Sequence, residues 1–92
     1  MEVEVEAVMD TPRPMRHVIA RSLLLPIPNF AVTADTTIAG IPVEALDLPP
    51  RACHPDSSPR FDLLSFRLRT RSDCPRFQRG QRVLVESIQL LT

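Results

Sequence analysis

The sequence predicts a mostly β, single-domain protein: a small antiparallel sandwich or open barrel over residues 1–92, with room for one short helix around 15–25. Two segments, 2–9 and 61–71, alternate apolar and charged residues at the two-residue period of a β-strand. Ninety-two residues fit one hydrophobic core and not two. Leu, Val and Ile must build that core, because the chain has no Trp, no Tyr and only four Phe.

The first predicted strand, from Glu2 to Met9, reads Glu-Val-Glu-Val-Glu-Ala-Val-Met. Its apolar face comprises Val3, Val5, Ala7 and Met9, and its charged face comprises Glu2, Glu4 and Glu6. Residues 10–14 follow with two prolines, which lack the N–H that a strand ladder needs, so a turn is expected there.

Residues 15–25 fit either a helix or a strand. Thr11 as the N-cap and Pro12 at the first helical position would begin a helix. The same residues also fit a strand that follows a five-residue turn. We favour the strand, because its neighbours are strands and Pro14 disfavours helical geometry in the residue before it.

The middle of the chain is divided by turn residues. Residues 30–34 alternate again, and 37–48 form a run with Val and Ile that Gly40 and Pro42 interrupt. A proline inside such a run predicts an edge strand or a bulge. Residues 49–60 hold four prolines and two serines, which predicts a loop long enough to contact a partner.

The segment 61–71 is the strand on which the prediction is centred. Leu64, Phe66 and Leu68 form its apolar side, and Arg67, Arg69 and Arg71 form its charged side. A polar turn is expected over 72–81. The last strand is expected over 82–91, where Val83 and Val85 lie on one face and Leu84, Ile88 and Leu90 on the other. A strand that is apolar on both faces belongs inside a sheet.

The acidic and the basic strand fit each other in one antiparallel register. In it the charged pairs are Glu2 with Arg71, Glu4 with Arg69 and Glu6 with Arg67, while Val5, Ala7 and Met9 meet Leu68, Phe66 and Leu64. A shift by one residue would ruin both faces. A parallel register matches the charges but leaves Leu64 and Phe66 without partners. The pairing fits one chain or two protomers that share a strand.

Charge is distributed unevenly along the chain, although the net charge is zero. The first fifty residues carry −4 and the remaining forty-two carry +4. Such asymmetry is typical of halves that pair with each other or of a half that faces a charged partner. Every basic residue is Arg, with ten Pro and a single Asn, as in a GC-rich genome or a small viral or phage protein.

These patterns predict a non-catalytic interaction module, a small viral or phage accessory or structural protein. We expect it to self-associate, as a dimer, or to bind a protein partner through a β-sheet edge. The interaction residues would be Glu2, Glu4, Glu6, Arg67, Arg69 and Arg71, with the 49–60 loop as a second contact.

The alternative function is Arg-mediated nucleic-acid binding by a small β-barrel. Seven arginines fall between residues 60 and 82, and the possible anion contacts beyond the interaction set are Arg60, Arg76, Arg79 and Arg82. Only three Phe lie nearby, whereas single-strand binders usually add aromatic stacking platforms.

Other classes of function receive little support from the sequence. Cys53, His54, Cys74 and His17 match no zinc spacing, so we expect no metal and no cofactor. The sequence contains no nucleophile elbow and no glycine-rich phosphate loop, so we expect neither an enzyme nor a small-molecule substrate. It also contains no apolar run of transmembrane length and no secretory signal pattern, which predicts an intracellular, cytoplasmic protein.

Overall fold

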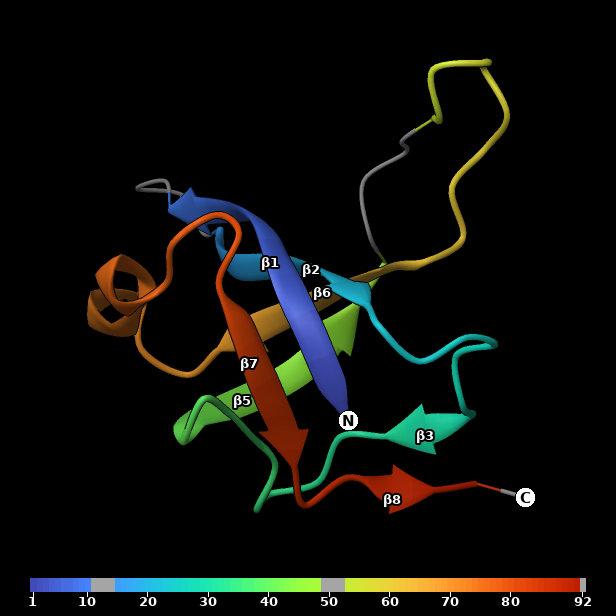
Figure 1. Cartoon of the computed structure of the whole chain (residues 1–92). Helices are drawn as coiled ribbons and strands as arrows, with labels where there is room; N and C mark the ends of the chain where they lie inside the picture. The colour runs from blue at the N-terminus through green and yellow to red at the C-terminus, as the bar shows by residue number, and fades with distance from the viewer. Residues whose placement is uncertain (11–14, 49–52, 92) are drawn as a thin grey trace.

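The computed structural model describes residues 1–10, 15–48 and 53–91, in which six antiparallel strands close into a barrel (Figure 1). The order around the barrel is β1-β2-β6-β5-β4-β7, and β3 and β8 form a separate two-stranded sheet. The mostly β prediction is confirmed. The elements are β1 (Glu2–Asp10), β2 (Arg16–Ser22), β3 (Phe30–Ala31), β4 (Thr37–Ile38), β5 (Ile41–Asp47), β6 (Leu63–Leu68), the 3₁₀ helix η1 (Arg71–Arg76), β7 (Arg82–Glu86) and β8 (Gln89–Leu90).

β1 confirms the first predicted strand but changes face partway along. Val3 and Val5 are fully buried, as expected. A bulge between Val5 and Ala7 then shifts the register against β2. Because a bulge adds one residue to a strand, the inward positions change from odd-numbered to even-numbered residues. Val8 therefore packs against the core in place of Ala7 and Met9, which corrects the predicted apolar face.

β2 shows that the segment around 15–25 is a strand and not a helix. It pairs with β1 on one side and with β6 on the other, and Val18 and Ala20 point into the core. Within the chain β1 pairs with β2 and β7, so the predicted pairing of the acidic strand with the arginine strand β6 inside one chain is wrong. A partner close in sequence loses less chain entropy on pairing, which favours β2 over β6 as the neighbour of β1. The turn expected over 10–14 lies mostly outside the described residues, as do Thr11 and Pro12.

A tight hairpin joins β4 to β5 inside the predicted 37–48 run. Ala39 and Gly40 both have positive φ, 53° and 77°, which is the geometry of a type I′ turn and explains the glycine. Pro42 lies in β5, which pairs with β4 on one side and β6 on the other. The bulge predicted from Pro42 occurs just after it, between Val43 and Ala45, while the edge-strand alternative is wrong.

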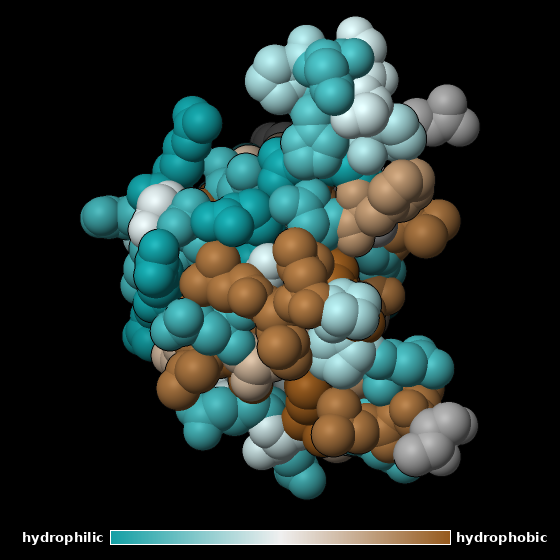
Figure 2. All heavy atoms as spheres, turned by 45° about the vertical axis from the view of Figure 1, so that its right-hand side comes forward, coloured by the Kyte–Doolittle hydropathy of each residue, from teal (hydrophilic) through white to brown (hydrophobic). Residues whose placement is uncertain are grey.

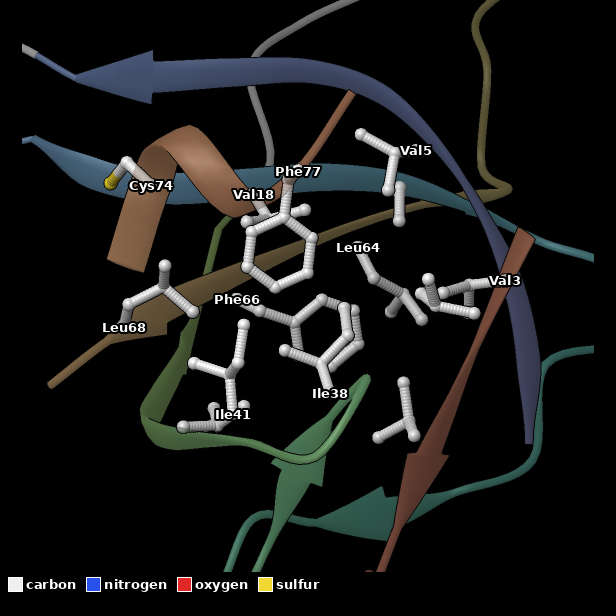
Figure 3. Close-up of a cluster of buried hydrophobic side chains, with 14 of the residues drawn as sticks. Val3, Val5, Val18, Ile38, Ile41, Leu64, Phe66, Leu68, Cys74 and Phe77 are labelled. Atoms are coloured by element: carbon white, nitrogen blue, oxygen red, sulfur yellow. The ribbon is translucent and has the colours of Figure 1, made fainter. Parts of the chain in front are cut away.

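The core lies inside the barrel and is built on β6 (Figure 3). Leu64, Phe66 and Leu68 are buried, which confirms the inward face read from the alternation. Aliphatic side chains from every other barrel strand surround them. These are Val3, Val5, Val18, Ala20, Ile38, Ile41, Val43, Val83 and Val85.

The predicted polar turn over 72–81 contains η1, whose segment contributes to the core. Cys74 and Phe77 are 1% and 5% exposed and belong to the core cluster. Figure 3 shows the Phe77 ring extending from this segment toward Phe66. The polar composition of the segment therefore concealed two apolar side chains that help to fill the barrel.

The predicted last strand, 82–91, is two strands. β7 lies between β1 and β4, as expected of an interior strand, and Val83 and Val85 point inward. Ser87 then adopts a φ of 59° and the chain leaves the barrel as β8. The hydroxyl of Thr36, which is 1% exposed, donates to the Ser87 carbonyl at 2.9 Å and holds this bend.

The predicted loop over 49–60 protrudes from the barrel in its described part, residues 53–60 (Figure 1). Cys53 and Pro59 form an isolated bridge, and His54 and Ser58 are joined by a backbone hydrogen bond. Asp56 accepts from the backbone N–H and the hydroxyl of Ser58, which orders the tip. Residues 49–52 of this loop lie outside the described residues.

Candidate functional site

The residues predicted for the interaction lie on β1, β6, η1 and the short link between β6 and η1, but they do not pair with one another. Glu4 meets Arg21 of β2 at 3.4 Å and Arg82 of β7 at 3.5 Å, its register partners on either side. The remaining contacts join Glu6 with Arg60, Arg67 with Glu44 and Asp47, Arg71 with Asp10, and Arg69 with the Ala34 carbonyl. In the described residues Glu2 has no ion pair. Glu4, Glu6, Arg67 and Arg71 thus have oppositely charged partners outside the predicted pairs, whereas Arg69 contacts only a backbone carbonyl.

A connected set of charges runs over β2, β5 and β6 on the outside of the barrel. Glu44 accepts from Arg16 at 2.6 Å and lies 3.0 Å from Arg67. Asp47 lies 3.6 Å from Arg67 and 2.6 Å from the Nε2 of His17. Each carboxylate therefore has two basic neighbours, and this wall presents no unbalanced charge to a ligand.

Arg60 links the base of the protruding loop to β1. Its guanidinium contacts Glu6 at 2.8 Å and Asp62 at 3.0 Å, and its side chain is only 17% exposed. The hydrogen bond from Arg60 lowers the pKa of Asp62 below its ordinary value, and the two carboxylates raise the pKa of Arg60. Arg60, which the sequence suggested as an anion contact, is therefore occupied by two carboxylates of its own chain.

The other suggested anion contacts lie on the surface near η1 and β7. Arg76 is 3.7 Å from Asp73 and Arg82 is 3.5 Å from Glu4. Of the nine arginines in the described residues, seven have a carboxylate within 4 Å: Arg16, Arg21, Arg60, Arg67, Arg71, Arg76 and Arg82. A phosphate backbone would have to displace these partners, which reduces the free positive charge available to it.

The two cysteines differ in their exposure to solvent. Cys53 is exposed in the protruding loop, whereas Cys74 is the buried residue of η1, and both are free thiols. Burial raises the pKa of the Cys74 thiol. Within residues 1–10, 15–48 and 53–91, no three His, Cys, Asp or Glu side chains gather in a way that could hold a metal ion. The same part of the chain has no helix with the length and apolarity needed to cross a bilayer.

The segment around β3 and β8 differs from the barrel in composition. Residues 22–34 and 87–92 contain no charged side chain, although 24% of the chain is charged. In the fold these two stretches meet, because β3 pairs with β8. We call residues 22–34 and 87–91 the uncharged unit. Depletion of charge is the compositional mark of an interface core.

An open apolar groove of about 520 Å³ lies where the uncharged unit joins the barrel. Figure 2 shows the hydrophobic atoms that gather on this side of the molecule. The residues that line the groove are Met1, Leu24, Pro28, Val85, Glu86, Ser87, Ile88 and Leu90. The ammonium group of Met1 donates to the Val85 carbonyl at 2.9 Å, so the charge at this end is already engaged.

Leucines around the groove are exposed to an unusual degree. Leu24 and Leu90 are 52% and 65% exposed, and the residues that follow them, Leu25 and Leu91, are 65% and 43% exposed. A cluster of exposed large apolar residues, unlike a single one, marks a contact surface. We take the groove and these leucines as the candidate site. The signal was present in the sequence as two stretches without charge, and reasoning from charged rows overlooked it.

A scan against protein-family models finds no match to this chain, and searches of curated proteins and of solved structures find none either.

Proposed function

We propose that the chain is a non-catalytic interaction module that binds a protein through the uncharged unit. The observation that carries this proposal is that two stretches without a charged side chain meet, carry four exposed leucines and border an apolar groove. A protein that stayed alone would expose this patch to water, at a cost of roughly 25 cal/mol per Å².

The closed barrel supports this position for the contact. Every barrel strand has a neighbour on both sides over at least part of its length, which leaves little free edge for strand addition. The two-stranded sheet of β3 and β8 has no such closure. The proposal therefore keeps binding through a sheet edge and moves it from the Glu and Arg rows to the uncharged unit. The viral or phage origin suggested by composition stays a prediction.

Photo-crosslinking tests this proposal. A photoreactive phenylalanine analogue placed at Leu90 is expected to give a covalent adduct with a protein in the cell that expresses the chain. The same analogue at Leu48, which is 95% exposed at the end of β5, is the matched control. Adducts at position 90 and none at position 48 support the proposal. No adduct at position 90, or equal adducts at both, would overturn it.

The nucleic-acid alternative predicts retention of an oligonucleotide that weakens steeply as salt rises. Ion pairing of most described arginines favours the opposite result. We expect no retention of a single-stranded or double-stranded oligonucleotide at 50 mM salt. Salt-dependent retention that Arg79→Gln and Arg69→Gln weaken would replace the first proposal with the second.

A further inference from the structure

β8 has a free backbone edge. The Leu91 N–H donates to the Asn29 carbonyl at 2.8 Å, and Phe30 lies opposite Leu90 in the register. Because antiparallel strands alternate the edge to which their backbone groups point, the N–H and C=O of Leu90 face away from β3. In the described residues β8 has no pairing strand other than β3.

This edge lacks the chemical protections that exposed strands usually carry, and only the shortness of β8, two residues, limits its pairing. Natural proteins blunt exposed edges with charges, prolines, bulges or very short strands. Between Ser87 and Thr92 the chain has none of the charged residues or prolines that would do so. The outward N–H and C=O of Leu90 are therefore open to pairing with another strand.

We infer, on the basis of the proposed function, that the covering strand is β8 of a second copy of this chain. The two β8 strands would run antiparallel about a two-fold axis at Leu90. The two Leu90 residues would then exchange two N–H···O hydrogen bonds. The result is one four-stranded sheet, β3-β8-β8-β3, that closes after two copies and does not extend into a fibre.

The charge pattern favours a second copy over an oppositely charged partner. A residue on a two-fold axis meets its own copy, so a charged side chain there would face a like charge at a cost in free energy. The uncharged unit has no charges to bring together. Glu86, the one carboxylate on the groove, belongs to β7 and lies before the β7–β8 bend.

The exposed apolar area indicates a weak dimer. Four leucines at the exposures given above present a few hundred Å² per chain, about half of the ~800 Å² that each partner contributes to a standard interface. The association should therefore depend on concentration in the micromolar range. Burial of Leu90 and Leu24 in the dimer would place the groove beside the two-fold axis.

The test is the mass in solution as a function of concentration, measured by sedimentation equilibrium on the full chain. We expect the mass to rise from 10.3 kDa toward twice that value. Leu90→Pro removes the outward N–H and leaves the Leu91 donor to β3, and Leu90→Arg places two like charges at the axis. Either substitution is expected to raise the dissociation constant at least ~10-fold. Leu48→Arg, the matched control, is expected to leave it unchanged.

Circular dichroism and the melting temperature of each variant report whether it is folded. A wild-type chain that stays monomeric at several hundred micromolar overturns the inference, and so does a folded Leu90→Pro variant that dimerises like the wild type. The crosslink at position 90 separates the two proposals. An adduct with a different protein alone defeats the dimer and keeps the interaction module, whereas no adduct at all defeats both.

Discussion

The barrel wall and the uncharged unit treat charge and strand edges in opposite ways. On the wall every strand has two neighbours, and Glu4, Glu6 and Glu44 each have basic partners. In the uncharged unit β8 has one neighbour and no charged side chain. Charges are a common defence of open edges, so a solitary protein should show the reverse. This difference in charge and in strand edges is the basis of our proposal that the uncharged unit binds a partner.

The largest expected difference between the two regions is in stability. Phe66 is fully buried in the barrel, so Phe66→Ala should lower the free energy of unfolding by about 3–5 kcal/mol. Leu90→Ala should lower it by about 0.5 kcal/mol, because the side chain is 65% exposed. Urea unfolding measures both.

If Phe66→Ala does not fold, Phe66→Leu serves in its place and should cost roughly 1–2 kcal/mol. Equal costs at positions 66 and 90 in the monomeric concentration range would contradict the division into a core-bearing barrel and a surface unit.

Thiol reactivity should separate the barrel end from the protruding loop. Cys53 is exposed, whereas Cys74 of η1 is buried, which raises the pKa of its thiol and hides its sulfur from a reagent. In a Cys53→Ser chain, we expect Cys74 to react with a disulfide reagent at least ~100-fold more slowly than in urea. A Cys74→Ser chain provides the comparison, since its remaining thiol should react at nearly the same rate in both solvents.

The ion pairs of Arg60 with Glu6 and Asp62 should make the stability of the barrel sensitive to acid. Arg60→Gln leaves Glu6 and Asp62 unneutralised and should cost about 1–2 kcal/mol at pH 7. Asp62 has a lowered pKa in the folded state, so its contribution is present above the unfolded-state pKa and is lost as pH falls through the folded value. Wild-type stability should thus drop below about pH 4.

Asp62→Asn is the control for this acid sensitivity. It should be less stable than the wild type at pH 7 and should lose less of its stability on acidification. Parallel pH profiles for the two proteins would show that the Arg60–Asp62 pair makes no such contribution.

The smallest effect is expected from the exposed ion pairs of the wall. Arg82 lies 3.5 Å from Glu4, and its side chain is 64% exposed. Arg82→Gln should change the free energy of unfolding by no more than ~0.5 kcal/mol, because water screens such pairs. A loss above 1 kcal/mol in urea unfolding would mean that the charges on the wall stabilise the barrel and do not merely balance one another.

The sequence predicted the elements whose pattern is local. Alternation placed Leu64, Phe66 and Leu68 inside. The neighbouring strands and the effect of Pro14 on the residue before it favoured a strand that the structure confirms as β2. The bulge after Val5 could not be foreseen, since nothing in the residue types marks the position where a strand gains a residue. The bend at Ser87 was equally hidden, because a positive φ there has no glycine to announce it.

The pairing of strands was wrong for a physical reason that the charges illustrate. Glu4 fits Arg69 in the imagined register, but it fits Arg21 and Arg82 equally well. Exposed ion pairs contribute too little energy to choose among three arginine-bearing segments, so connectivity and apolar packing decide. The two stretches of the uncharged unit could, by contrast, have been found in the sequence. A stretch without charged residues can be recognised without knowing which strands pair.

The position of β7 has a consequence for how the chain folds during synthesis. β7 fills the gap between β1 and β4, and its Val85 carbonyl meets an ammonium group 84 positions away. While the chain is being synthesised, β1 cannot pair with β7 until almost all of the other strands have left the ribosome. Until then one edge of β1 has no partner strand. Contacts so distant in sequence slow the final step of refolding toward the millisecond-to-second range. During that interval Val3 and Val5 are the surfaces that a chaperone would protect.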